Sequence, residues 1–158
     1  MRKREVLVVE DEPDIARLMS VIFDSARYTL TWVGDLSTAR ARIRVKPPPD
    51  LVVLDEGLPD GSGLDLCREL KRRWPVLPVL LVTALPRSSI FGEALAAGVD
   101  DFIAKPFDPD ALLTAAEMLV SDGVGPPLGA GGQAHSRGED DPDHPDARDG
   151  EDLVRQMT

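Results

Sequence analysis

The chain has 158 residues, of which 28 are acidic and 18 basic, for a formal net charge of -10. This length allows one ordinary domain with an extension but not two full domains, and a hydrophobic fraction of 42% is enough for a packed core. The negative balance disfavours nucleic-acid binding through charge alone, because phosphates require clustered Lys and Arg. The single cysteine, Cys67, excludes an internal disulfide and a thiolate metal cluster.

Short apolar runs recur along the first 121 residues. Most are continuous, which is typical of strands that are buried on both faces. The run that starts at Tyr28 instead alternates apolar and polar residues, as a more exposed strand does. The predicted strands are residues 6–9, 28–33, 51–54, 79–82 and 101–104.

Each predicted strand is followed by a helical pattern. Pro13 and Asp14 open the first helix, Ser37 can cap the second, and Gly98 ends the fourth. A Pro/Gly-rich loop is expected at residues 58–63, between the third strand and the third helix. The predicted helices are residues 13–22, 37–44, 64–74, 89–97 and 109–120.

Alternating strands and helices predict an α/β fold, in which helices cover both faces of a parallel sheet. We expect a flavodoxin-like, doubly wound five-stranded sheet of order 2-1-3-4-5 with five helices. This domain occupies residues 1–121. Residues 122–158 hold 9 acids, 3 bases and 7 of the 13 glycines, and no aromatic residue, so we expect an acidic, Gly/Pro-rich, disordered tail. Its two histidines, His135 and His144, are interpreted as solvated residues rather than metal ligands.

No targeting or membrane segment is recognisable in the sequence. The apolar run behind the basic N-terminus covers only residues 6–9, which is too short for a signal peptide. The longest apolar stretch, residues 76–85, contains Pro78 and is too short to cross a bilayer. We therefore expect a cytoplasmic protein without a membrane anchor.

Polar residues follow four of the predicted strands. Glu10 and Asp11 follow the first strand and Asp55 follows the third. Thr83 follows the fourth strand and Lys105 the fifth. Ligands of such sheets bind at the carboxyl ends of the strands, so these side chains are expected to converge. Crowded carboxylates suit a hard cation such as Mg²⁺, and an aspartate beside that cation can act as a nucleophile toward phosphorus.

Each of these residues also has a structural explanation when it is taken alone. Acidic residues at positions 10–12 favour a helix N-terminus, Asp55 is an ordinary loop residue, and Lys105 is an ordinary surface lysine. Thr83 taken alone is an ordinary strand residue. All of these explanations would have to hold at different strand ends of one chain, so we favour a single converging site.

Four stretches of the chain, in order, are VLVVEDE at 6–12, LVVLDEGLPDGSG at 51–63, LVTA at 81–84 and GVDDFIAKPF at 98–107. Together they closely resemble the receiver domain of two-component response regulators. The resemblance covers about residues 3–121. It implies a module of phosphorelay signal transduction that accepts a phosphoryl group from a sensor histidine kinase or a phosphotransfer protein.

The resemblance also implies a role for each matching residue. Asp55 would be phosphorylated, and Glu10, Asp11, Asp55 and the backbone carbonyl of Gly57 would hold Mg²⁺. Thr83 and Lys105 would bind phosphoryl oxygens beside the small Ala84, and the bond before Pro106 would be cis. Thr83 and Phe102 would switch together, and would change a surface formed by helix 4, strand 5 and helix 5. Phe102 also has a simpler interpretation as a static core residue.

The chain departs from the family pattern in three places. Gly57 and Leu85 stand where a polar side chain could orient an attacking water, so slow loss of the phosphoryl group is expected. The predicted helices at 89–97 and 109–120 contain no Lys or Arg to pair with Asp100 and Asp101 across an ion-paired dimer. Homodimerisation stays open. The remaining bases are interpreted as solvated faces of the second and third helices; they are Arg40, Arg42, Arg44, Lys46, Arg68, Lys71, Arg72 and Arg73.

Several function classes compete at this point. The leading hypothesis is a receiver that acts on a downstream protein, without a DNA-binding output domain, a nucleic-acid ligand or an enzymatic activity beyond its own phosphorylation and dephosphorylation. The alternative is the N-terminal receiver fragment of a truncated DNA-binding transcriptional regulator. An Asp-dependent phosphatase would need a second acid where Gly57 stands. A flavin- or nucleotide-binding protein would need a phosphate-cradling loop after the first strand, where Glu10 and Asp11 stand instead.

Overall fold

A five-stranded parallel sheet forms the centre of residues 2–122, which are the residues that this computed structural model describes. The strand order is β2-β1-β3-β6-β7, in which β6 and β7 are the fourth and fifth strands of the sheet. The flavodoxin-like fold and the order 2-1-3-4-5 are therefore confirmed. The strands are β1 (Arg4–Val9), β2 (Tyr28–Val33), β3 (Leu51–Asp55), β6 (Val79–Thr83) and β7 (Asp101–Ala104).

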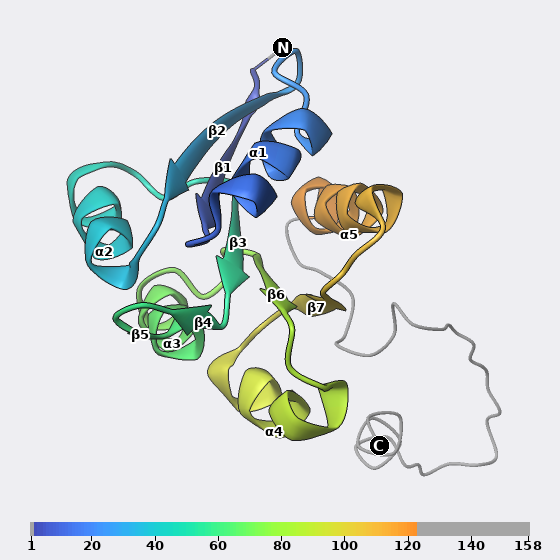
Figure 1. Cartoon of the computed structure of the whole chain (residues 1–158). Coiled ribbons are helices and arrows are strands. Elements are labelled where there is room, and N and C mark those ends of the chain that lie inside the picture. The colour runs from blue at the N-terminus through green and yellow to red at the C-terminus, as the bar shows by residue number, and fades with distance from the viewer. Residues whose placement is uncertain (1, 123–158) are drawn as a thin grey trace, which may run out of the picture.

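Five helices cover the two faces of the sheet (Figure 1). Buried residues of α1 and α5 pack on one face, and buried residues of α2, α3 and α4 pack on the other. Strands β3 and β6 are covered on both sides, which explains their continuous apolar sequences. The helices are α1 (Pro13–Ile22), α2 (Leu36–Val45), α3 (Gly63–Arg73), α4 (Arg87–Ala97) and α5 (Pro109–Asp122).

The strand register brings the carboxyl ends of four strands to one edge of the sheet. Val9, the last residue of β1, pairs with Leu54, and Asp55 pairs with Val82. Thr83 in turn pairs with Ala104. Residues that follow these strands are therefore neighbours in space although they are far apart in the sequence.

The start of α2 differs from the sequence prediction. Asp35, not Ser37, is the N-cap, because its carboxylate accepts a hydrogen bond of 2.7 Å from the Thr38 N–H. The Asp60 carboxylate accepts the N–H groups of Leu36 and Ser37 at 2.8 and 3.0 Å. Two carboxylates thus satisfy donors at the helix start, and the prediction of a Ser37 cap is wrong.

Two further local features were not predicted. The loop expected at 58–63 forms, together with Gly57, a small antiparallel hairpin of β4 (Gly57–Leu58) and β5 (Gly61–Ser62). Helix α4 starts at Arg87, two residues earlier than expected, so the helix does carry one base. Its end agrees with the prediction, since Gly98 caps it with a left-handed backbone at φ 94°.

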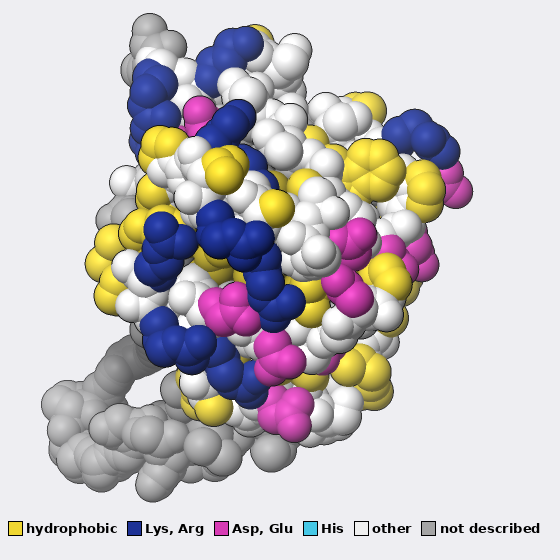
Figure 2. Space-filling model, turned by 90° about the vertical axis from the view of Figure 1, so that its left-hand side faces the viewer, with side chains coloured by type: hydrophobic (Ala, Val, Ile, Leu, Met, Phe, Trp, Pro, Cys, Tyr) yellow, Lys and Arg dark blue, Asp and Glu magenta, His cyan; other side chains and the backbone are white. Residues whose placement is uncertain are grey.

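Lys and Arg side chains gather on the face that Figure 2 shows. Among the bases of α2 and α3, Arg40 and Lys71 form ion pairs rather than a freely solvated face. Arg40 of α2 binds Glu69 of α3 at 2.7 Å, and Lys71 binds Asp100 at 2.6 Å. Lys71 is only 16% exposed, so its interpretation as a solvated residue is wrong. These pairs join α2 to α3, and α3 to the residue that precedes β7.

The remaining sequence predictions concern membrane segments and the tail. Within residues 2–122, no helix combines the length and the apolar character that a membrane crossing requires. The predicted disordered tail, apart from its first residue, lies outside the described residues.

The cap of α2 gives a direct test of the local structure. Replacing Asp35 by Ala removes the acceptor of the Thr38 N–H and should lower the free energy of unfolding by about 0.5–2 kcal/mol. Ser37→Ala is the matched control and should leave it nearly unchanged, because Ser37 is exposed and is not the cap. Urea unfolding of the two variants measures both values. A larger loss in Ser37→Ala than in Asp35→Ala would contradict the assigned cap.

Candidate functional site

Three carboxylates meet where β1 and β3 end. Glu10 and Asp11 directly follow β1, and Asp55 is the last residue of β3. One carboxylate oxygen from each of the three lies within 4.8 Å of the others. Glu10 and Asp55 are buried, whereas Asp11 is exposed. The arrangement follows from the parallel register, as the strand-end argument predicted.

Lys105 lies between the two buried carboxylates. Its Nζ is 3.1 Å from Glu10 Oε1 and 3.3 Å from Asp55 Oδ2. Burial lowers the pKa of Lys105, but the charges of Asp55 and Glu10 outweigh this effect and leave that pKa above its usual value. Lys105 is therefore an ammonium in the folded domain, and it offsets part of the negative charge of the site.

The Lys105 ammonium donates to Glu10 Oε2 at 3.4 Å and to Asp55 Oδ2 at 3.3 Å, but not to Glu10 Oε1. Glu10 is 1% exposed, and its Oε1 is buried without a hydrogen bond, although Lys105 Nζ lies near it. Its Oε2 accepts the Glu12 N–H at 3.1 Å. Burial, followed by the charge of Asp55, raises the pKa of Glu10 to about 7. The ionised form of Glu10 is therefore disfavoured unless more positive charge arrives.

The unsatisfied Glu10 oxygen and the three converging carboxylates fit a divalent cation. Hard carboxylate oxygens are the ligands that Mg²⁺ prefers, and Mg²⁺ usually takes only a few protein ligands and keeps several waters. The exposed Asp11 leaves one side of the cluster open to solvent. Glu10, Asp11 and Asp55 are thus the residues that would hold the cation.

Thr83 and its neighbours line the same edge. Thr83 is 2% exposed, and its hydroxyl accepts the Leu85 N–H at 3.0 Å, so it is directed to the loop before α4. Ala84 is exposed at the end of β6. The peptide bond between Lys105 and Pro106 is cis. Phe102 lies within β7 and packs against α4 rather than reaching the carboxylates.

The loop after Asp55 is held by contacts that sequence reasoning missed. The Gly57 N–H faces Asp55 Oδ1 at 3.4 Å, and the Glu56 carboxylate accepts the Ser62 hydroxyl and the Leu64 N–H. At Gly63, a Cβ atom would lie 2.1 Å from the Asp55 carbonyl oxygen, so only glycine allows α3 to start this close to β3. The second glycine of the motif DGSG, Gly63, is the sequence signal that could have indicated this close approach of α3 to β3.

Trp32 is a second residue whose role was missed. Its indole Nε1–H donates a 2.6 Å hydrogen bond to the Glu10 carbonyl, although the side chain is 45% exposed. The sequence pattern indicates only that it belongs to the alternating residues of an exposed strand. Its position makes it an intrinsic fluorescent probe beside the carboxylates.

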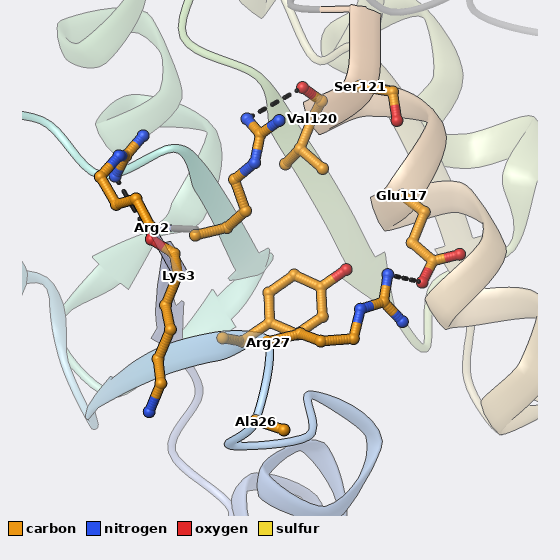
Figure 3. Close-up of a pocket in the computed structure, with 9 residues that line it drawn as sticks. Arg2, Lys3, Ala26, Arg27, Glu117, Val120 and Ser121 are labelled. Carbon is orange, nitrogen blue, oxygen red and sulfur yellow. Dashed lines mark hydrogen bonds and ion pairs between the residues drawn. The ribbon is translucent and has the colours of Figure 1, made fainter.

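A pocket of about 450 Å³ lies at the other end of the sheet, where β1 and β2 begin (Figure 3). Arg27 and Glu117 in its wall form a 2.8 Å ion pair, and Arg4 donates to the Val120 carbonyl at 3.3 Å. The carboxylate cluster is therefore separate from this pocket. The pocket is lined by Arg2, Lys3, Arg4, Ala26, Arg27, Tyr28, Glu117, Val120 and Ser121.

The family model of the response regulator receiver domain matches residues 6–117. The chain belongs to the response regulator receiver family. The receiver is 41% identical over 115 residues to the probable transcriptional regulatory protein TcrX of Mycobacterium tuberculosis; the match covers 73% of this chain and 49% of TcrX. The chain spans about half the length, or less, of the curated relatives that it matches.

Solved structures agree with this family. A response regulator of Chloroflexus aurantiacus is 25% identical to the receiver with a TM-score of 0.71, and the match covers 76% of this chain and 99% of that one. The BeF3-activated receiver domain of DrrB, from Thermotoga maritima, is 27% identical with a TM-score of 0.68, again over 76% of this chain and 99% of that one. The similarity therefore covers whole receiver domains.

The raised pKa of Glu10 predicts an unusual pH dependence of stability in metal-free protein. Between the unfolded value of 4.5 and about 7, the unfolded chain loses a proton that the folded chain keeps, so stability should fall as the pH rises. Glu10→Gln should remove this part of the slope and raise the melting temperature at pH 8 in EDTA. Thermal unfolding from pH 5 to pH 8 measures both effects. A wild-type profile that matches Glu10→Gln over this range would contradict the assigned pKa.

Proposed function

We propose that the receiver accepts a phosphoryl group on Asp55, in a reaction that depends on Mg²⁺, and passes the signal on by changing a protein-binding surface. The observation that carries the proposal is the position of Asp55. Asp55 is 7% exposed, and its carboxylate lies beside Glu10 and Asp11 with the Lys105 ammonium 3.3 Å away. A nucleophile for phosphorus, a cation site and a fixed positive charge are thus combined at one strand edge.

The chemistry follows from these groups. A carboxylate oxygen of Asp55 attacks phosphorus, while the bond between phosphorus and the donor's leaving atom breaks. Lys105 binds an oxygen of the transferred group and stabilises its charge, and the Thr83 hydroxyl binds another after it leaves the Leu85 N–H. The small Ala84 leaves room for the group. A bound Mg²⁺, held by Glu10, Asp11, Asp55 and the Gly57 carbonyl, would supply further charge neutralisation.

The proposed output is a surface formed by α4, β7 and α5. Phosphorylation gives Thr83 a new partner, so the loop that follows Thr83 and the ring of Phe102 rearrange together. Such a change requires contacts that differ between two states of the domain. Phe102 is positioned to make such contacts, because it lies in β7 and packs against Phe91 of α4.

The proposed partners are those of a phosphorelay module in the cytoplasm. The donor is a sensor histidine kinase or a phosphotransfer protein, and the recipient of the signal is a downstream protein. The receiver would catalyse its own phosphorylation and dephosphorylation and no other reaction. We propose no direct nucleic-acid contact by this domain.

A second candidate function is the N-terminal receiver of a DNA-binding transcriptional regulator. TcrX is named a probable transcriptional regulatory protein, and the match covers only 49% of it. The reading frame around the codon of Thr158, determined from the genome and the transcript, distinguishes the two candidates. A frame that continues into a DNA-binding domain would favour the second.

Phosphorylation of Asp55 has a direct test. Incubation with Mg²⁺ and acetyl phosphate should give an acid-stable, base-labile adduct of one phosphoryl group, detected by intact-protein mass spectrometry. Asp55→Ala and added EDTA should each abolish it. Asp65→Ala is the matched control, since Asp65 is an exposed acid of α3 that pairs only with Arg68, and it should react normally. An adduct that persists in Asp55→Ala would refute the proposal.

The lifetime of the adduct gives a second test. Because Gly57 and Leu85 offer no polar side chain to orient water, the wild-type adduct should last for minutes or longer. Gly57→Asn should shorten this lifetime, and a Cβ at residue 57 meets no atom within 4 Å, so the backbone position has room for a side chain to begin. Gly92→Asn on α4 has equally open space and should not change the lifetime. The decay of the adduct after removal of the donor measures the lifetime in wild type and in both variants. Equal lifetimes in Gly57→Asn and wild type would contradict the role assigned to a missing polar side chain at residue 57.

A further inference from the structure

The first residue of α4 is a cation in an electrostatically unfavourable place. Helix N-termini carry a partial positive charge and favour acidic residues, yet α4 begins with Arg87 and has no acid in its first turn. Its N-cap, Pro86, makes no side-chain hydrogen bond that would offset this. Any interaction that compensates for the charge of Arg87 at this helix end must therefore come from its tertiary contacts.

Arg87 meets two aromatic rings. Its Cζ lies 4.9 Å from the ring centre of Phe102 and 5.8 Å from that of Phe91. Both distances are within the range of a cation–π interaction. The rings contact one another edge to face, with centres 6.3 Å apart and planes at 68°. Arg87, Phe91 and Phe102 thus form one stacked group, which we call the Arg87 stack.

The stack is half buried and joined to β7. Phe91 and Phe102 are 6% and 9% exposed, whereas Arg87 is exposed. The Asp101 carboxylate accepts the Phe102 N–H at 2.9 Å. Burial raises the pKa of Asp101, and the positive charge of Arg87 acts against this shift. The Arg87 side chain therefore contributes a positive charge to the stack and covers the two rings on the side that faces solvent.

The same short loop connects the stack to the phosphorylation site. The Thr83 hydroxyl accepts the Leu85 N–H, and Arg87 follows only two residues later. A rotation of Thr83 toward Asp55 breaks this hydrogen bond and frees the loop that leads to Arg87. Phe102, in the neighbouring strand β7, contacts Arg87. Arg87 therefore links the loop after Thr83 to the Phe102 ring.

We propose that Arg87 is a positioning residue that holds Phe102 in its packed position and so sets how readily the receiver changes state. This inference rests on the proposed function. The contact between Arg87 and Phe102 exists in the state that this structure shows, and it weakens if the Phe102 ring moves. A contact present in only one of two states shifts the balance between them, and by linkage it lowers the affinity for any ligand that needs the other state.

Binding of beryllofluoride with Mg²⁺, an analogue of the phosphoryl group, tests this inference. Arg87→Met keeps an apolar stem but removes the charge, and it should bind the analogue about two- to fivefold more tightly than wild type. Arg87→Lys keeps a charge and should fall between the two. Arg68→Met is the matched control, since Arg68 pairs on the surface of α3 with Asp65, and it should bind like wild type.

Fluorescence of Trp32 reports the titration, because its indole donates to the Glu10 carbonyl. The measurements are made in a Trp74→Phe background, which removes the second of the two tryptophans. Equal or weaker analogue binding in Arg87→Met would overturn the inference. If wild type itself shows no saturable binding that Asp55→Ala abolishes, the proposed function fails and this inference fails with it.

A spectroscopic signal separates positioning from a change in stability. The protein has four phenylalanines, so fluorine NMR of fluorophenylalanine-labelled protein can resolve each ring, with Phe102 assigned by Phe102→Leu. In Arg87→Met without ligand, the Phe102 signal should move toward its position in the analogue complex. In Arg68→Met it should stay where it is in wild type. An unmoved Phe102 signal in Arg87→Met would overturn the positioning role.

Discussion

The crowding of negative charge between Glu10 and Asp55 is the constraint on which the rest of the site depends. Parallel register places both carboxylates at one edge, and burial removes the water that would screen them. The single ammonium of Lys105 leaves Glu10 Oε1 without a hydrogen bond. The folded domain therefore has an unmet preference for positive charge where a metal and a phosphoryl donor would approach. The proposed affinity for a cation and a cost in metal-free stability would have the same physical origin.

The backbone around Asp55 is supported so that this charge stays in place. Gly63 allows α3 to start against the Asp55 carbonyl. The Glu56 carboxylate accepts the Ser62 hydroxyl and so stabilises the hairpin between them. Asp60 extends this support to the start of α2, whose N–H groups it accepts. The proposed phosphoryl transfer would benefit from such rigid support, because a fixed carboxylate needs no reorganisation during the reaction.

The site residues at the strand ends could be predicted from the sequence, because a single pattern, the apolar run of a buried strand, determines where each strand ends. Buried parallel strands must be apolar throughout, so their ends were readable, and with them the positions of Glu10, Asp55 and Lys105. The cap of α2 was not, since Asp35 and Ser37 both suit a cap and the direction in which the chain enters the helix decides between them. The indole of Trp32 reaching the Glu10 carbonyl depends on the pairing of β2 with β1, which the local sequence of β2 does not encode.

Arg87 lies on the surface of α4, β7 and α5 that is proposed as the output of the domain. It is the only Lys or Arg in α4, β7 and α5, so a partner that approaches this surface with a carboxylate finds one cation to pair with. That cation already contacts the rings of Phe91 and Phe102. Under the proposed mechanism, pairing with a partner would draw Arg87 from the rings and favour the same movement of Phe102 as phosphorylation would. Because linkage is reciprocal, phosphorylation at Asp55 would then strengthen binding of an acidic partner at the start of α4.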